Sequence, residues 1–309
     1  MQELTVGDTS WIHLDNPSED EVYSLADRFP FHRFNLADCV SKRQPSKIER
    51  HSSYLFVIVQ LPVWEEKNGY VASQVSVFIG RNYVVTINDG RIKSLIDTFR
   101  DFKESSIDAG KIAEIGSEYL FFSILHPMIV DIFPLMEDLG ERLKVLKEYV
   151  YSPRREALFE ISELRGDLSD LRRTIAPLRM VAPMLKEEIK KLTGGDLDIY
   201  FNDITDHVEK IWELYDESRE TAEIYKDTDF ILYQQVMNRA LIILTVIFTI
   251  TIPLSIISSL YGMNVNLPGG VETGPLTFLG PHTTFIVLLA ISLTPALIML
   301  TYFRRLGWI

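Results

Sequence analysis

Residues 238–264 read NRALIILTVIFTITIPLSIISSLYGMN, and the apolar run inside this stretch decides the fold. Ala240 to Tyr261 is a run of 22 residues without a charged side chain. At 1.5 Å per residue, a helix of this length crosses a hydrocarbon core of about 30 Å. Soluble helices of similar length nearly always carry a charged face. We therefore expect a transmembrane helix here and set aside a buried helix of a soluble domain.

A second apolar run, Thr283 to Phe303, follows a connection rich in glycine and proline, residues 265–282. Arg239 borders the first run, Arg304 and Arg305 follow the second, and the connection contains no Lys or Arg. Basic residues concentrate on the cytoplasmic side of membrane proteins. The pattern predicts a multi-pass protein of the cell (inner or plasma) membrane with both termini in the cytoplasm.

Two spans present most of their surface to lipid and cannot enclose a water-filled path. A transport function would therefore require several copies of the chain around an axis.

The remainder of the chain is acidic. The formal net charge is −12, and since residues 240–309 sum to +1, residues 1–239 carry −13. Such a surface repels phosphates, which argues against nucleic acid as a partner. The N-terminus shows no basic segment followed by an apolar stretch, so no secretory signal is expected. The single cysteine and six scattered histidines show no sequence spacing typical of zinc sites.

Short strand signals dominate the first hundred residues. Trp11 to Leu14 is an apolar strand, and the following Ser18 and Glu21 have the spacing of a capping box that begins a helix. Tyr54 to Trp64 and Tyr70 to Ile79 flank Asn68-Gly69, a hairpin signal. A further strand at 83–87 completes an expected α/β domain.

Helical patterns follow, at 119–151, 154–192 and from about Asp196 onward. No Pro or Gly occurs between Asp196 and Ile252, so the third helix is predicted to continue into the first span. Its residues 196–229 hold twelve acids against three bases. Clustered carboxylates suit hard cations such as Mg²⁺, but a solvated helix face gives the same pattern, and both readings remain open.

The fold class expected from these signals is an α+β membrane protein. Its expected parts are a cytoplasmic α/β domain (1–110), a cytoplasmic helical stalk (111–239), a first transmembrane helix (240–262), an extracellular loop (263–282), a second transmembrane helix (283–303) and a basic cytoplasmic tail (304–309).

The segment Tyr261-Gly262-Met263-Asn264 closes the first span, and it resembles the signature of the CorA family of divalent-cation channels. The stretches RTIAPLR (173–179), YFNDITDH (200–207) and DCVSKRQPSKIE (38–49) also resemble family segments. The likeness covers nearly the whole chain. It implies a funnel-shaped homopentamer in which the first span lines the pore and the second lies outside it.

The resemblance makes Gly262, Met263 and Asn264 the expected selectivity filter. Five Asn264 amide oxygens around an axis would accept hydrogen bonds from the water shell of Mg²⁺, an ion that dehydrates reluctantly. A stripe at alternating steps of three and four predicts the pore-lining residues below the filter: Asn238, Leu241, Thr245, Phe248, Ile252, Ser255 and Ser259. Leu244 is expected to join Leu241, Phe248 and Ile252 in an apolar constriction at the centre of this stripe.

The same resemblance suggests a regulatory metal site in which Asp38 faces Asp203 of a neighbouring subunit, with the bound ion favouring a closed state. Ala37 stands where a second acid is expected beside Asp38, which removes one carboxylate from this site.

The expected function is passive Mg²⁺ influx, inhibited by cytoplasmic Mg²⁺, with Co²⁺ and Ni²⁺ as further candidate ions. No nucleotide-binding motif or catalytic constellation is visible, so we expect neither an enzyme nor an organic cofactor; the membrane potential supplies about 4.6 kcal/mol per 100 mV for a divalent ion. The expected partners are further copies of the chain, the lipid bilayer and divalent cations. Two alternatives remain: a zinc-transporting relative, and a membrane-anchored scaffold or enzyme whose acidic body binds a partner.

Overall fold

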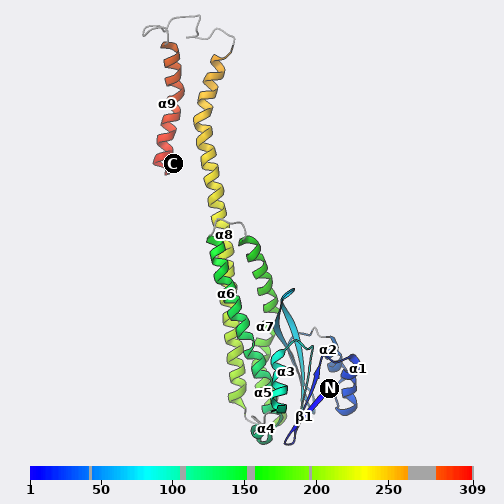
Figure 1. The fold of residues 1–309 in the computed structure, drawn as a ribbon. Coiled ribbons are helices and arrows are strands. Elements are labelled where there is room, and N and C mark those ends of the chain that lie inside the picture. The colour runs from blue at the N-terminus through cyan, green and yellow to red at the C-terminus, as the bar shows by residue number, and fades with distance from the viewer. Residues whose placement is uncertain (42–43, 105–108, 152–156, 195–196, 264–282, 308–309) are drawn as a thin grey trace. The chain divides into compact units, whose positions relative to one another are not determined.

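The computed structural model describes residues 1–41, 44–104, 109–151, 157–194, 197–263 and 283–307. The chain divides into two units, Met1–Asp227 and Thr228–Ile309, and the division falls within one helix, α8 (Asp198–Tyr261). Figure 1 shows the elements in chain order by colour. The first unit contains the sheet, and the second contains the most apolar part of the sequence.

The first unit is built on a six-stranded mixed sheet of order β1-β2-β6-β5-β4-β3. Strands β2 and β6 are parallel, and the remaining neighbours are antiparallel. The strands are β1 (Gln2–Val6), β2 (Thr9–Asp15), β3 (Lys47–Arg50), β4 (Leu55–Glu65), β5 (Gly69–Ile79) and β6 (Tyr83–Asn88).

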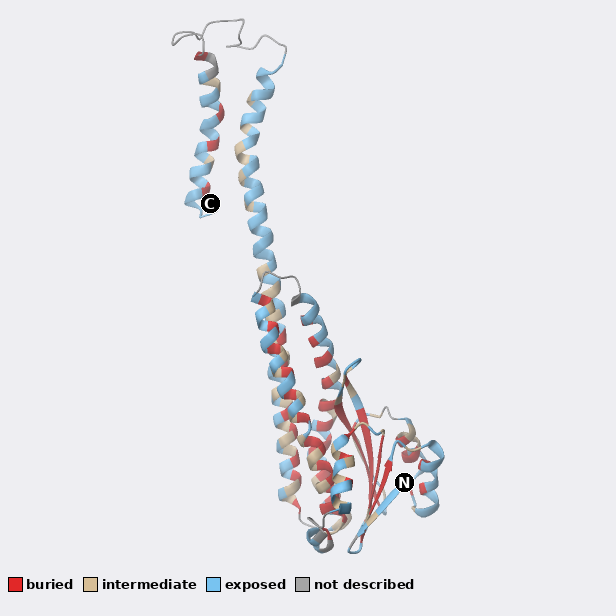
Figure 2. Cartoon of the chain, viewed as in Figure 1, coloured by how far each residue is buried: buried red, intermediate tan, exposed pale blue. Residues whose placement is uncertain are grey.

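Helices cover both faces of this sheet. On one face, Phe56 and Phe78 pack in a core with residues of α1 (Glu19–Arg28) and α2 (Arg33–Ser41). On the other face, α7 (Ala157–Thr193) lies against β4 and β5. The central strands are therefore buried along most of their length (Figure 2), as expected for strands covered on both sides.

Several local predictions are confirmed. Ser18 is the N-cap of α1, and its backbone N–H donates to the Glu21 carboxylate at 2.9 Å while the Glu21 N–H donates back to the Ser18 hydroxyl at 3.3 Å. Strands β4 and β5 pair as the predicted hairpin, and Gly69 has a positive φ of 70° that few other residues adopt at low cost.

The remaining helices of this unit are α3 (Lys93–Glu104), α4 (Ala109–Ile115), α5 (Ser117–Val130) and α6 (Ile132–Tyr151). The prediction of one helix over residues 119–151 is wrong in detail, because α5 ends and α6 begins around Asp131. Pro134 has no N–H to donate to the carbonyl of Val130, so the helical ladder is interrupted here.

The predicted continuous helix is confirmed by α8, whose 64 residues correspond to about 96 Å. The second unit holds the apolar part of α8 and the separate helix α9 (Thr283–Arg305). By length and composition, three of the described helical segments are apolar enough to cross a membrane: α8, the 286–305 part of α9, and 117–151. Half of the apolar window in 117–151 is buried inside the chain, whereas none of the α8 window is.

Candidate functional site

Asp38, one half of the predicted regulatory pair, lies in the last turn of α2. Its carboxylate pairs with the Lys47 ammonium at 2.7 Å, and Lys47 also bonds to Glu49 at 2.5 Å. Burial disfavours the charged form of Lys47, but the hydrogen bonds that its ammonium donates to Asp38 and Glu49 outweigh this effect and raise the Lys47 pKa. Within one chain, Asp38 and Glu49 therefore share the positive charge of Lys47.

Asp203, the other half of that pair, lies on α8 beside two histidines. Its Oδ2 is 3.2 Å from Nε2 of His126, on α5, and 3.5 Å from Nδ1 of His207, one turn further along α8. One potential ligand atom from each residue lies within 4.8 Å of the others. We call these three residues the Asp203 cluster. The structure thus gives Asp38 and Asp203 different partners within the chain.

Sequence reasoning found only part of the Asp203 cluster. Asp203 and His207 both fall in the quoted segment 200–207, and a spacing of four places them on one helix face. His126 is 77 residues away from Asp203 in sequence and belongs to no recognisable motif. Only the packing of α5 beside α8, seen also in the contact of Phe121 with Phe201, brings it to the carboxylate.

The acidic part of α8 is partly neutralised. The Arg179 guanidinium on α7 donates its Nε–H to both Glu209 oxygens at 2.9 Å. Arg219 pairs with Asp216 at 3.0 Å and with Glu223 at 3.1 Å. These acids therefore hold helices together or stabilise their own helix, which favours the structural reading for this subset.

All eight predicted pore-lining residues lie on α8, and each is exposed in the single chain. Leu241 is 56% exposed and Phe248 is 51% exposed, but Ile247, on another side of the helix, is 50% exposed as well. The Thr245 hydroxyl donates to the Leu241 carbonyl at 2.8 Å, within the helix. In one chain, residues on more than one side of the apolar part of α8 are equally exposed, so the pore-facing stripe stays a prediction.

The predicted filter begins where α8 ends. Gly262 donates its N–H to the Ser258 carbonyl at 2.9 Å, and a Cβ added at Gly262 would lie 3.1 Å from that same oxygen. Glycine at this position avoids a close contact between a side chain and the last helical turn; its φ is not positive. Met263 is 54% exposed, and Asn264 lies outside the described residues.

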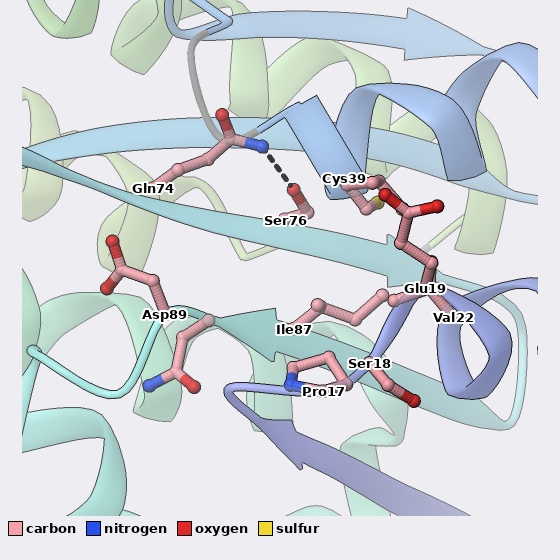
Figure 3. Close-up of a pocket in the computed structure, with 11 residues that line it drawn as sticks. Pro17, Ser18, Glu19, Val22, Cys39, Gln74, Ser76, Ile87 and Asp89 are labelled. Atoms are coloured by element: carbon pink, nitrogen blue, oxygen red, sulfur yellow. Dashed lines mark hydrogen bonds between the residues drawn. The ribbon is translucent and has the colours of Figure 1, made fainter.

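A pocket of about 310 Å³ opens between α1, α2 and strands β5 and β6 (Figure 3). Polar side chains in its wall are already hydrogen-bonded: Gln74 Nε2 donates to Ser76 Oγ at 3.0 Å, and Asp89 accepts from Arg91 Nε at 3.0 Å. Burial raises the pKa of the Cys39 thiol in this wall to about 12. Since the thiolate is the reactive form, Cys39 is unsuited to nucleophilic catalysis.

Comparison with known proteins connects this geometry to transport. The family model described as CorA-like Mg²⁺ transporter protein matches residues 7–305. The cobalt/magnesium transport protein CorA of Thermotoga maritima is 26% identical over 303 residues, covering 97% of this chain and 83% of that protein. The putative metal ion transporter YfjQ of Bacillus subtilis is 26% identical over 301 residues, covering 96% and 89%.

A solved structure shares the fold along the whole chain. The complete CorA magnesium transporter from Methanocaldococcus jannaschii superposes with a TM-score of 0.78 at 22% identity, covering 100% of this chain and 95% of that one.

Proposed function

The chain belongs to the CorA-like Mg²⁺ transporter family, and from that premise we propose that it is the subunit of a homopentameric channel for passive Mg²⁺ influx. The observation that carries the proposal is the ending of α8. Its last 22 residues are uncharged and exposed or half-exposed in the single chain, and they lead directly into Gly262-Met263-Asn264. Such a helix needs lipid on one side and has a side left for further copies of itself.

In this proposal, five α8 helices surround the path and α9 lies outside them. The Asn264 amides select a hydrated ion, with the apolar residues Leu241, Leu244, Phe248 and Ile252 forming a constriction that closes by dewetting. The membrane potential drives entry. Both termini lie in the cytoplasm, where Mg²⁺ bound between Asp38 and a neighbouring Asp203 favours the closed state.

The test is Mg²⁺ uptake into proteoliposomes under an inside-negative potential, comparing the parent chain with Asn264→Ala. Asn266→Ala is the matched control, because it removes the same amide two residues further along the same connection. We expect uptake by the parent and by Asn266→Ala, and loss of uptake in Asn264→Ala. Equal uptake by all three would remove Asn264 from the filter, and no uptake by any would contradict a Mg²⁺ channel.

A zinc-transporting relative is the second candidate, and one feature favours it. The imidazoles of His126 and His207 beside Asp203 suit zinc better than Mg²⁺. The same proteoliposomes loaded with a zinc-sensitive dye decide between the two: zinc uptake that depends on Asn264, with no Mg²⁺ uptake, would replace the first proposal. A membrane-anchored scaffold would show neither flux.

A further inference from the structure

Lys47 lies between two carboxylates that come from different elements of the first unit. Its Nζ is 2.7 Å from Oδ2 of Asp38, on α2, and 2.5 Å from Oε1 of Glu49, on β3. The side chains of Lys47 and Asp38 are 27% and 21% exposed, so this contact is partly shielded from water. One ammonium thus occupies the space between the two acids.

Neighbouring groups hold both acids in place. Asn35 donates from Nδ2 to Oε2 of Glu49 at 2.5 Å, and its own Oδ1 accepts from the Tyr54 hydroxyl at 2.9 Å. Asn35 and Tyr54 are both buried. The backbone carbonyl of Asp38 accepts a hydrogen bond from Nε2 of Gln74, on β5, at 3.0 Å. The two acids therefore stay near each other if the ammonium moves away.

Lys47 is the movable member of this group. Its ammonium is a point charge on a flexible four-carbon stem, and the partly exposed side chain can turn that charge into solvent. Two adjacent carboxylates without a counter-ion repel each other, and carboxylate oxygens are the protein ligands that Mg²⁺ prefers. Departure of the ammonium would therefore leave a place that suits a divalent cation.

The position of Glu49 compensates for a residue that the sequence lacks. Ala37 stands where a second acid is expected beside Asp38, and Glu49 brings a carboxylate to the same ammonium. We propose that Lys47 is a tethered cation that competes with Mg²⁺ for Asp38, and that the ion which displaces it takes Glu49 as a second carboxylate. This inference rests on the proposed inhibition by Mg²⁺ bound at Asp38. Lys47 then sets the cytoplasmic Mg²⁺ concentration at which the channel closes.

The test changes the charge at residue 47 and measures inhibition of uptake into proteoliposomes by Mg²⁺ on the cytoplasmic side. Lys47→Met keeps an unbranched stem and removes the ammonium. We expect half-maximal inhibition at a Mg²⁺ concentration lower by about tenfold or more, because a positive charge no longer opposes the ion. Lys47→Arg should require a higher concentration than the parent, since a guanidinium can donate to both carboxylates at once.

Two controls separate this effect from a general change of charge. Arg50→Met removes a cation from the same strand, but Arg50 pairs with Glu188 at 3.9 Å, so inhibition should match the parent. Lys47→Met combined with Glu49→Gln removes one charge of each sign. It should therefore return the inhibitory concentration toward the parent value.

Calorimetric titration of the full-length chain in detergent with Mg²⁺ gives a readout that does not require transport. Tighter binding by Lys47→Met than by the parent, with no uptake by either, would contradict the channel and support the competition. Equal or weaker binding and inhibition in Lys47→Met, or the same gain in Arg50→Met, would overturn the proposal. Inhibition of Lys47→Arg at a lower concentration than the parent would also overturn it. Circular dichroism verifies that each variant keeps its helices.

Discussion

Similar apolar side chains are buried in the first unit, Met1–Asp227, and exposed in the apolar part of α8, residues 240–261. We call these two regions the body and the span. In the body, Phe56 and Val57 are fully buried by the helices that cover the sheet. In the span, Ile247 and Ile256 are 50% and 55% exposed, although their surroundings in the sequence are just as apolar. Folding of one chain is sufficient to remove apolar surface from water in the body, whereas one folded chain leaves the apolar surface of the span exposed. In the proposed channel, lipid and further copies of the chain would cover it.

The largest effect that tests this comparison is a cavity in the body. Phe56→Ala removes a ring with no exposed surface and should lower the free energy of unfolding by about 3–5 kcal/mol. Phe159→Ala removes the same atoms from a side chain of α7 that is 72% exposed, and it should cost less than about 1 kcal/mol. Thermal unfolding of the full chain in detergent measures both.

A large loss in Phe159→Ala would show that this exposed ring is covered by another copy of the chain. The exposed face of α7 would then belong with the surfaces that only assembly of several chains can bury.

The body was predictable from sequence where local chemistry alone determines the structure. The capping box at Ser18 and the hairpin at Gly69 each depend on residues close together in the chain. Strands β1 and β3 were not predicted, because both are short, and β1 is mostly exposed while β3 is half-buried. The break at Asp131 was missed because the apolar pattern continues across it. The helical hydrogen bonds do not continue, since Pro134 lacks the N–H that would donate to the Val130 carbonyl.

The candidate sites also contain residues that local sequence places and residues that only tertiary packing places. Gly262 and the four-residue spacing of Asp203 and His207 could be found in the sequence, because the chain itself places them. The position of His126 in the Asp203 cluster depends on which helix packs beside α8, and pairing of Asp38 with Lys47 depends on how β3 lies beside α2. Sequence periodicity does not determine such contacts.

A smaller expected effect is on membrane insertion, and it compares two positions of one helix, α8. Ile247→Asp places a carboxylate in the middle of the predicted span and should cost about 3 kcal/mol of membrane insertion. Ile199→Asp is the matched control, because Ile199 is 81% exposed in the first turn of the same helix, where the helix dipole favours an acid. The measurement is the fraction of chain that resists alkaline extraction from membranes.

We expect that fraction to fall for Ile247→Asp and to stay at the parent value for Ile199→Asp. Equal integration of both variants would mean that residue 247 faces water or protein rather than lipid, and that this part of α8 is not surrounded by lipid at that depth.

The smallest expected effect is the pH dependence of stability caused by one buried histidine of the body. His13 on β2 is 4% exposed, its Nδ1 lies 2.9 Å from the Thr86 hydroxyl, and burial lowers its pKa from 6.5 to about 4. The folded state therefore favours the neutral ring, and the unfolded state takes up a proton first as the pH falls. The contribution of His13 to the free energy of unfolding is fully present above pH 6.5 and is lost as the pH falls toward 4, by about 2 kcal/mol between pH 7 and pH 5.

Replacing this imidazole tests whether burial is the cause. His13→Gln cannot take up a proton, so the fall in unfolding free energy between pH 7 and pH 5 should be smaller by about 2 kcal/mol than in the parent chain. His32→Gln, an exposed histidine of the same unit, should keep the pH dependence of the parent. The apolar runs 240–261 and 283–303 offer no comparable group, because neither contains a His, Asp or Glu. Acid should therefore unfold the body while the helical signal of the spans persists, and simultaneous loss of both would show that the two regions do not unfold independently.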